Sequence, residues 1–145
     1  MLIKQISIFV ENKVGRLSSI IDVLGESKVD ISALSIADTT DFGILRVIVD
    51  KPDVAINALK EHGVAVKSTD VIALAIDDTP GGLSEVLATL TKNNITIEYM
   101  YAFVGKKEGK ALMVFKTDDL VKTQKVLEED EHVTVIDLND IYKNI

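Results

Sequence analysis

The sequence contains no cysteine, no tryptophan and only two prolines among its 145 residues. Without cysteine the chain has neither a disulfide framework nor a thiolate for catalysis. Its two histidines, His62 and His132, are too few to supply the roughly four Cys or His ligands of a structural zinc site. We therefore expect no metal site and no cofactor.

Clustered positive charge and long apolar runs are also missing. The net charge is −7 and the pI is about 4.8, whereas phosphate contacts need grouped Lys and Arg. The densest basic cluster, Lys106, Lys107 and Lys110, is interrupted by Glu108 and predicts a solvated turn. No apolar run approaches the roughly twenty residues of a membrane span, and the N-terminus lacks a signal-peptide layout. We expect neither nucleic acid nor a membrane as a partner, and a cytoplasmic location.

The two halves of the chain repeat each other around a glycine loop. The segment Asn12-Lys13-Val14-Gly15-Arg16-Leu17 recurs, 66 positions later, as Asp78-Thr79-Pro80-Gly81-Gly82-Leu83. Each loop follows an alternating apolar run and precedes a segment with helical apolar spacing. Because loop chemistry repeats as well as hydrophobic pattern, the sequence predicts a duplicated module with a duplicated site. We expect two domains, residues 1–68 and 69–145.

Both halves have the pattern strand, helix, strand, strand, helix, strand. The predicted strands lie near residues 2–10, 30–37, 43–50 and 64–68, then 71–77, 95–104, 110–117 and 133–137. The predicted helices lie near 15–27, 53–62, 81–93 and 119–129, with a short helix over 137–142. Asp50 and the Thr79-Pro80 pair are expected to start helices, and Gly63 and Asn93 to end them.

This order predicts an α+β protein of two tandem ferredoxin-like βαββαβ units, each an antiparallel sheet with its helices on one face. RNA-binding proteins of this fold need stacking aromatics on the central strands, and here the third strands carry only Phe115. No Ser/His/Asp grouping, pair of acids or activated Lys is visible, so we expect no enzymatic activity.

The second loop resembles the Asp-x-Pro-Gly-x-Leu signature of ACT domains, with every fixed position matched in residues 78–83. The first loop, residues 11–17, is similar to the looser Glu-Asn-x-x-Gly-x-Leu version of ACT subunits that regulate branched-chain amino-acid synthesis. The resemblance covers essentially the whole chain. It implies a stand-alone tandem ACT protein that senses a free amino acid, bound where the first loop of one domain meets the second strand of a neighbouring domain.

The loop chemistry fits that role. A glycine at the turn lets a ligand approach the backbone, and the first N–H groups of the following helix can receive a carboxylate. Asp78 is expected to pair with a ligand ammonium, and Asn12 to accept from one. The resulting candidate ligand-binding residues are Asn12, Lys13, Val14, Gly15, Arg16, Leu17, Leu34, Ser35, Asp78, Thr79, Pro80, Gly81, Gly82, Leu83, Tyr99 and Met100.

Several alternatives stay open at this point. The glycines could serve only close packing, Leu17 and Leu83 are expected to be core residues, and burial explains Tyr99 as well as ligand contact does. The chain could also be an oligomerisation module that pairs with a separate biosynthetic enzyme and binds no ligand. A homodimer is compatible with the surplus apolar residues of the sheets. Because the first loop is basic and the second acidic, either the two sites bind different ligands or one has lost binding.

Overall fold

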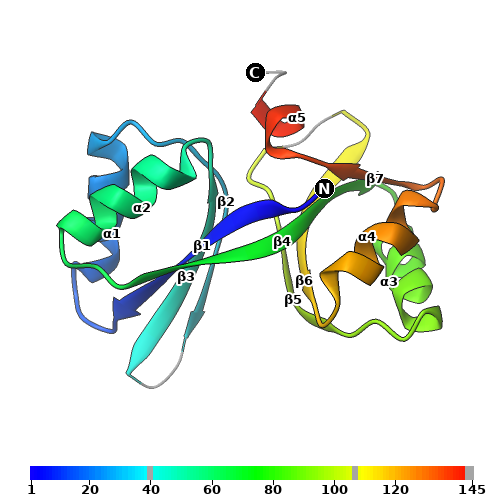
Figure 1. Cartoon of the computed structure of the whole chain (residues 1–145), viewed down its shortest axis with the longest axis horizontal. Helices are drawn as coiled ribbons and strands as arrows, with labels where there is room; N and C mark the ends of the chain where they lie inside the picture. The colour runs from blue at the N-terminus through cyan, green and yellow to red at the C-terminus, as the bar shows by residue number, and fades with distance from the viewer. Residues whose placement is uncertain (39–40, 106–107, 143–145) are drawn as a thin grey trace. The chain divides into compact units, whose positions relative to one another are not determined.

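The computed structural model describes residues 1–38, 41–105 and 108–142. The chain divides into two compact units. The first unit is Lys4–Thr69, and the second unit is Met1–Ile3 together with Asp70–Ile145. Each unit has the expected βαββαβ pattern with an antiparallel sheet and its helices on one side, which confirms the predicted α+β, ferredoxin-like fold class (Figure 1).

The first unit is built on the strand order β2-β3-β1-β4. Its elements are β1 (Ile3–Glu11), α1 (Arg16–Glu26), β2 (Ile31–Asp38), β3 (Phe42–Val49), α2 (Pro52–Glu61) and the start of β4 (Val66–Asp77). β3 pairs antiparallel with both β1 and β2. The apolar faces of α1 and α2 pack on one side of this sheet over a core of Ile6, Ile8, Val10, Ile20, Val23, Leu24, Val29, Leu45, Val47, Val49, Ala55 and Leu59.

The second unit repeats this arrangement with the strand order β5-β6-β4-β7. Its elements are the remainder of β4, α3 (Gly82–Lys92), β5 (Ile97–Ala102), β6 (Lys110–Thr117), α4 (Leu120–Glu128), β7 (Val133–Ile136) and the short α5 (Leu138–Tyr142). β4 pairs antiparallel with β6 and β7, and β5 with β6. The core comprises Ile72, Leu74, Ile76, Val86, Leu90, Ile95, Phe115, Leu127 and Val133.

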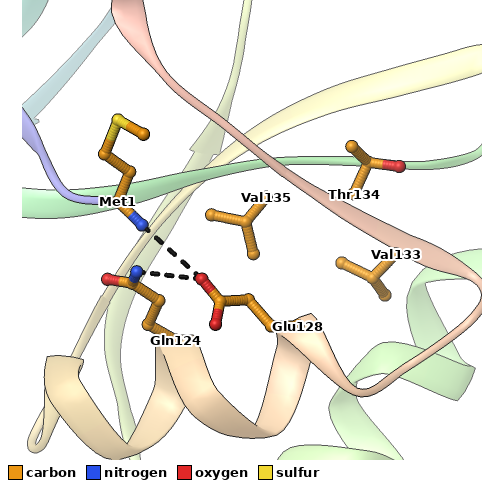
Figure 2. Close-up of a pocket in the computed structure, with 6 residues that line it drawn as sticks. All are labelled: Met1, Gln124, Glu128, Val133, Thr134 and Val135. Atoms are coloured by element: carbon orange, nitrogen blue, oxygen red, sulfur yellow. Dashed lines mark hydrogen bonds and ion pairs between the residues drawn. The ribbon is translucent and has the colours of Figure 1, made fainter.

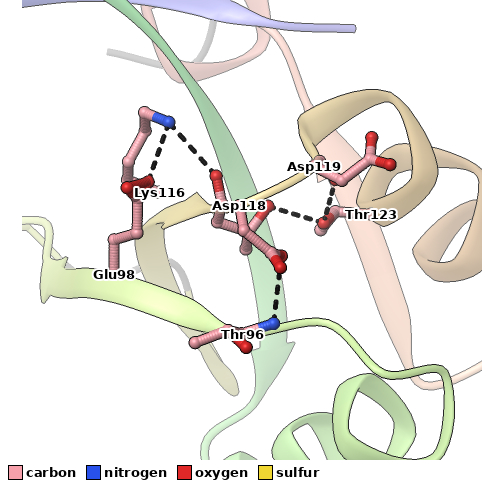
Figure 3. A network of polar contacts seen from close by, with 7 residues as sticks. Thr96, Glu98, Lys116, Asp118, Asp119 and Thr123 are labelled. Atoms are coloured by element: carbon pink, nitrogen blue, oxygen red, sulfur yellow. Dashed lines mark hydrogen bonds and ion pairs between the residues drawn. The ribbon is translucent and has the colours of Figure 1, made fainter.

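The duplication extends to the hydrogen bonds that fix the entry into the second strand. In the first unit, Asp30 N donates to Asp50 Oδ1 at 2.9 Å, and Asp50 N donates to Asp30 O at 3.1 Å. In the second unit, Thr96 and Asp118 make the same pair of bonds, at 3.0 and 3.1 Å (Figure 3). The prediction that Asp50 caps α2 is therefore wrong: Lys51 holds the cap position, and Asp50 joins two strand ends instead.

Two other boundaries differ from the sequence prediction. The strands expected at 64–68 and 71–77 are one strand, β4, because Ser68-Thr69-Asp70 contains neither glycine nor proline to interrupt an extended backbone. Thr79-Pro80 does not start α3, since Gly81 is its cap residue and Gly82 its first residue.

The two predicted helix ends are confirmed. Gly63, with a φ of 73°, and the Asn93-Asn94 pair do end helices as expected. Lys106 and Lys107 lie outside the described residues. Over the described ranges, no helix is both long and apolar enough to cross a membrane.

Candidate functional site

The first glycine loop lies between the end of β1 at Glu11 and the start of α1 at Arg16. Its last residue, Gly15, has a left-handed backbone conformation. Gly15 has φ 85° and ψ −8°, a conformation that residues with a side chain rarely adopt. Arg16 N donates to Lys13 O at 3.2 Å, and Ser19 N donates to Gly15 O at 2.9 Å, which is the first bond of the helix. The loop is thus a tight turn that delivers the chain directly into α1.

The second glycine loop has the same backbone. Gly81 has φ 86° and ψ −7°, within one degree of its counterpart. Gly82 N donates to Thr79 O at 3.0 Å, and Glu85 N donates to Gly81 O at 3.1 Å, so both loop bonds are repeated. The glycine and the two hydrogen bonds that follow it therefore have the same geometry in both loops, although the loop sequences differ.

Both helices that follow the loops begin at a cap residue without a side chain. The cap residue of α1 and of α3 is a glycine, which has no side chain to accept a hydrogen bond, whereas the cap residue Asp119 accepts from the first turn of α4. Helix geometry gives the N–H groups of Leu17 and Ser18, and of Leu83 and Ser84, no carbonyl within their own helix. Together with the positive end of the helix dipole, such donors favour an anion by about 0.3–1 kcal/mol at an exposed position.

Charged side chains surround the first loop. Glu11 Oε2 lies 3.2 Å from Lys13 Nζ and 3.9 Å from Arg16 Nη2. All three side chains are about half exposed or more, so each pair stabilises the fold by at most about 1 kcal/mol. Asn12 Nδ2 donates to Asp38 Oδ1 at 2.9 Å, which connects the loop to the end of β2. Two of the candidate ligand-binding residues, Lys13 and Arg16, thus lie beside an acid of the chain itself.

A hollow of about 370 Å³ lies beside this loop, between the end of β1 and the start of β3. Its lining consists of Glu11, Asn12, Lys13, Asp41 and Phe42. Asn12 N donates to Asp41 O at 3.3 Å, which holds the β3 side of the hollow to the loop. Glu11, Asp41 and Phe42 were not among the predicted site residues, because sequence spacing does not show which strand ends meet.

The second loop has a different ion pair beside it. Asp77, the last residue of β4, pairs with Lys110 at the start of β6, and Asp78 N donates to Gly109 O at 3.1 Å. The hydrogen bond from Lys110, and then its charge, hold the pKa of Asp77 below the ordinary value, while burial opposes this shift and His132 adds to it slightly. The acid at this position is therefore ionised at neutral pH.

Replacing Lys110 by methionine should raise the pKa of Asp77 towards its ordinary value, because the hydrogen bond and the charge that lower it are both lost. In the native chain the lowered pKa stabilises the fold above the unfolded pKa, and this contribution disappears as the pH falls through the lowered value. An NMR titration of the Asp77 carboxyl carbon measures the shift. Lys116→Met, which removes the Glu98 ion pair of the same sheet, should leave Asp77 unchanged.

The predicted residues on the second strands lie apart from the loop of their own unit. Ser35 pairs with Arg46, which pairs with Ser7, so Ser35 lies about 13 Å before the end of β1. Met100 pairs with Phe115 but is 39% exposed, and Tyr99 stacks on Tyr101 with ring centroids 6.5 Å apart. The contribution of Leu34, Ser35, Tyr99 and Met100 to a site, which the resemblance assigns to a neighbouring domain, stays a prediction.

The two loop leucines differ in burial. Leu83 is half-buried and packs against the core of the second unit, as expected. Leu17 is 40% exposed, so the expectation of a core residue is wrong there. The first residue of α1 that is buried is Ile20, one turn later. The apolar face of Leu17 is consequently available to something outside the core.

A second hollow, of about 380 Å³, contains none of the predicted residues. Its lining is Met1, Gln124, Glu128, Val133, Thr134 and Val135. Glu128 Oε1 lies 3.9 Å from the Met1 amine and accepts from Gln124 Nε2 at 3.0 Å (Figure 2). Across residues 1–38, 41–105 and 108–142, no group of three or more His, Cys, Asp or Glu side chains is placed to hold a metal ion.

Comparison with known proteins gives one family and several solved structures. The family model described as "ACT domain pair" matches residues 1–143. The crystal structure of protein BT0572 from Bacteroides thetaiotaomicron is similar, with a TM-score of 0.91, 41% identity, and coverage of 99% of this chain and 97% of that one. A comparison with curated proteins finds no match.

The ligand-free regulatory subunit of aspartate kinase from Thermus thermophilus is similar with a TM-score of 0.63 and 14% identity, over 87% of this chain and 91% of that one. The corresponding subunit from Thermus flavus gives 0.60 and 12%, over 87% and 90%. At such identities the two subunits share the fold alone. The family match, which covers nearly the whole chain, is decisive: the protein belongs to the ACT domain family as an ACT domain pair.

Proposed function

We propose that this ACT domain pair is a non-enzymatic regulatory protein that binds a free amino acid at its glycine loops. The observation that carries the proposal is the repetition, in both units, of a left-handed glycine at the cap position of the helix that follows the loop. Selection for packing alone would not require two loops of different sequence to keep the same glycine geometry.

The two ends of an amino acid match what surrounds each loop. Its carboxylate would receive the N–H groups of the first helical turn, for example those of Leu17 and Ser18 in the first unit. Its ammonium would lie near hydrogen-bond acceptors. At the first loop these are the amide oxygen of Asn12 and the carboxylate of Asp38, and at the second loop the carboxylate of Asp78. The two Thermus relatives are regulatory subunits of aspartate kinase, which agrees with a regulatory rather than catalytic role.

One observation favours a second candidate, an oligomerisation module that pairs with a separate metabolic enzyme and binds no ligand. β2 is the terminal strand of the first unit's order, and its Leu34 and Ile36 are 44% and 54% exposed. Terminal strands with apolar side chains tend to associate with other chains. The same feature would support a homodimer.

A thermal-shift screen of the twenty proteinogenic amino acids separates these candidates. A ligand at a hundred times its dissociation constant should stabilise the chain by about 2.7 kcal/mol. Because an amino acid has only about ten heavy atoms, we expect a dissociation constant in the micromolar to millimolar range. Sodium acetate and ammonium chloride, which carry one ligand charge each, are the controls. A screen in which no amino acid exceeds these salts would favour the oligomerisation module.

A further inference from the structure

We propose that Asp38 supplies, in the first unit, the negative charge towards the ligand ammonium that Asp78 supplies in the second unit. The inference rests on the proposed function and adds a residue that the loop signature does not contain. It assigns to the Asn12–Asp38 pair the role that a single aspartate has in the other loop.

Comparing the two repeats at their offset of 66 residues shows that the carboxylate stands at a different position in each repeat. Asn12 corresponds to Asp78, and Asp38 corresponds to Val104. The same offset relates β2 to β5, because β2 has a register shift between Ile31 and Ala33 and β5 has one between Ile97 and Tyr99. Each repeat therefore has one carboxylate and one uncharged residue at these two positions, in opposite order. Val104 is 68% exposed, so burial does not explain the loss of charge there.

The strand arrangement brings Asp38 to the loop. β1 and β2 both run antiparallel to β3, so they run parallel to each other, and their last residues lie at the same end of the sheet. β1 ends at Glu11 and β2 at Asp38, and the intervening β3 begins with Phe42. The 2.9 Å bond from Asn12 Nδ2 to Asp38 Oδ1 then spans the two strand ends.

Two other acids lie near the first loop, and each is less suited to this role. The carboxylate of Glu11 already faces two cations, Lys13 and Arg16, which offset its charge. Asp41 contacts the loop through its backbone carbonyl, which accepts from Asn12 N. Asp38, by contrast, has its carboxylate hydrogen-bonded to the side chain of Asn12, the residue that replaces the signature aspartate.

The role predicts a dependence on the ammonium group of the ligand. A charge-assisted bond between carboxylate and ammonium is about twice as strong as a neutral one, whereas a hydroxyl in the same place gains no such attraction. An amino acid should therefore lose affinity when Asp38 is neutralised, and the α-hydroxy acid with the same side chain should not. A residue that only held the loop in shape would affect both compounds equally.

The experiment is a backbone-amide NMR titration of the whole chain with each of the twenty amino acids at about 10 mM, above most of the expected range. Amides of Leu17 and Ser18 report on the first loop, and those of Leu83 and Ser84 on the second. The amino acid with the largest first-loop response is then compared with its α-hydroxy analogue. In Asp38→Asn we expect about tenfold weaker binding of the amino acid at the first loop, with second-loop and hydroxy-acid binding unchanged.

The matched variants copy the second repeat. Asp38→Val alone should weaken first-loop binding, and Asn12→Asp combined with Asp38→Val should restore it. Asp53→Asn is the control for net charge. Asp53 lies in α2 and pairs with Lys4 near the start of β1, so its replacement should leave amino-acid binding at the first loop unchanged. No response of either loop in the unaltered chain to any amino acid would contradict the proposed function. A response only at the second loop, a first-loop response unchanged by Asp38→Asn, or no recovery in the double variant would overturn the Asp38 inference alone.

Discussion

Replacing Gly82 by alanine is expected to lower the free energy of unfolding by about 3 kcal/mol. A Cβ at this residue would lie 2.3 Å from Asp77 O, closer than any real Cβ contact, and the atom it meets is backbone rather than a flexible side chain. The start of α3 or the end of β4 would have to move. Urea denaturation followed by circular dichroism measures the loss.

Two variants serve as controls for Gly82→Ala. Gly25 lies exposed inside α1, and a Cβ there would meet nothing within 4 Å. Gly25→Ala should therefore raise stability by about 0.5–1 kcal/mol, the usual difference in helix propensity. Arg16 occupies the position of Gly82 in the first loop, and Arg16→Ala should change stability by less than about 1 kcal/mol. If Gly82→Ala were as stable as the unaltered chain, Asp77 O would not constrain this position.

The second large effect concerns binding. Gly15→Val and Gly81→Val should each abolish amino-acid binding at their own loop and leave the other loop and the fold intact. A Cβ at either glycine would meet nothing within 4 Å, so the new side chain would enter the open space before the helix start. Left-handed backbone costs a residue with a side chain about 1–2 kcal/mol, which a folded chain can tolerate. Calorimetry of each variant with the amino acid found by the thermal screen measures the loss.

Gly63→Val is the matched control for these variants. Gly63 also has a positive φ, 73°, and no atom within 4 Å of its missing Cβ, but it ends α2 and belongs to neither loop. It should show the same loss of stability with unchanged binding. If Gly15→Val and Gly81→Val fold and both bind with unaltered affinity, the loops are packing devices, and the case for a sensor rests on family membership alone.

The elements of this fold could be predicted because short-range patterns specify them. The apolar spacing of the helices and the alternation of the strands predicted each helix and all the strands apart from the division of β4 into two, and Gly63 marked the end of α2. The first turn of α1 was misjudged for a physical reason. Periodicity identifies the apolar face of a helix, but it does not show how far along the helix the sheet extends, so Leu17 was expected in a core that begins at Ile20.

Side-chain partners across the sheet could not be predicted in the same way. Asp38 is 26 residues from Asn12, and only the pairing of β2 with β3 and of β3 with β1 brings them together. The prediction that Asp50 caps α2 was wrong for a similar reason. The Asp50 carboxylate accepts instead from the backbone N–H of Asp30, which lies 20 residues away in the sequence. One sequence signal for Asp38 did exist: its counterpart 66 residues later is Val104, just as the counterpart of Asn12 is Asp78.

The close approach of Asp77 O to Gly82 also limits how the two repeats can diverge or be grafted onto each other. Moving the second loop into the first unit places a glycine at Arg16, where a residue with a side chain is already accommodated. The reverse graft places an arginine at Gly82, where even a Cβ meets the strand backbone. Gene conversion or loop transplantation between the halves should therefore succeed in one direction, and a chain with two copies of the second loop is the easier one to reach.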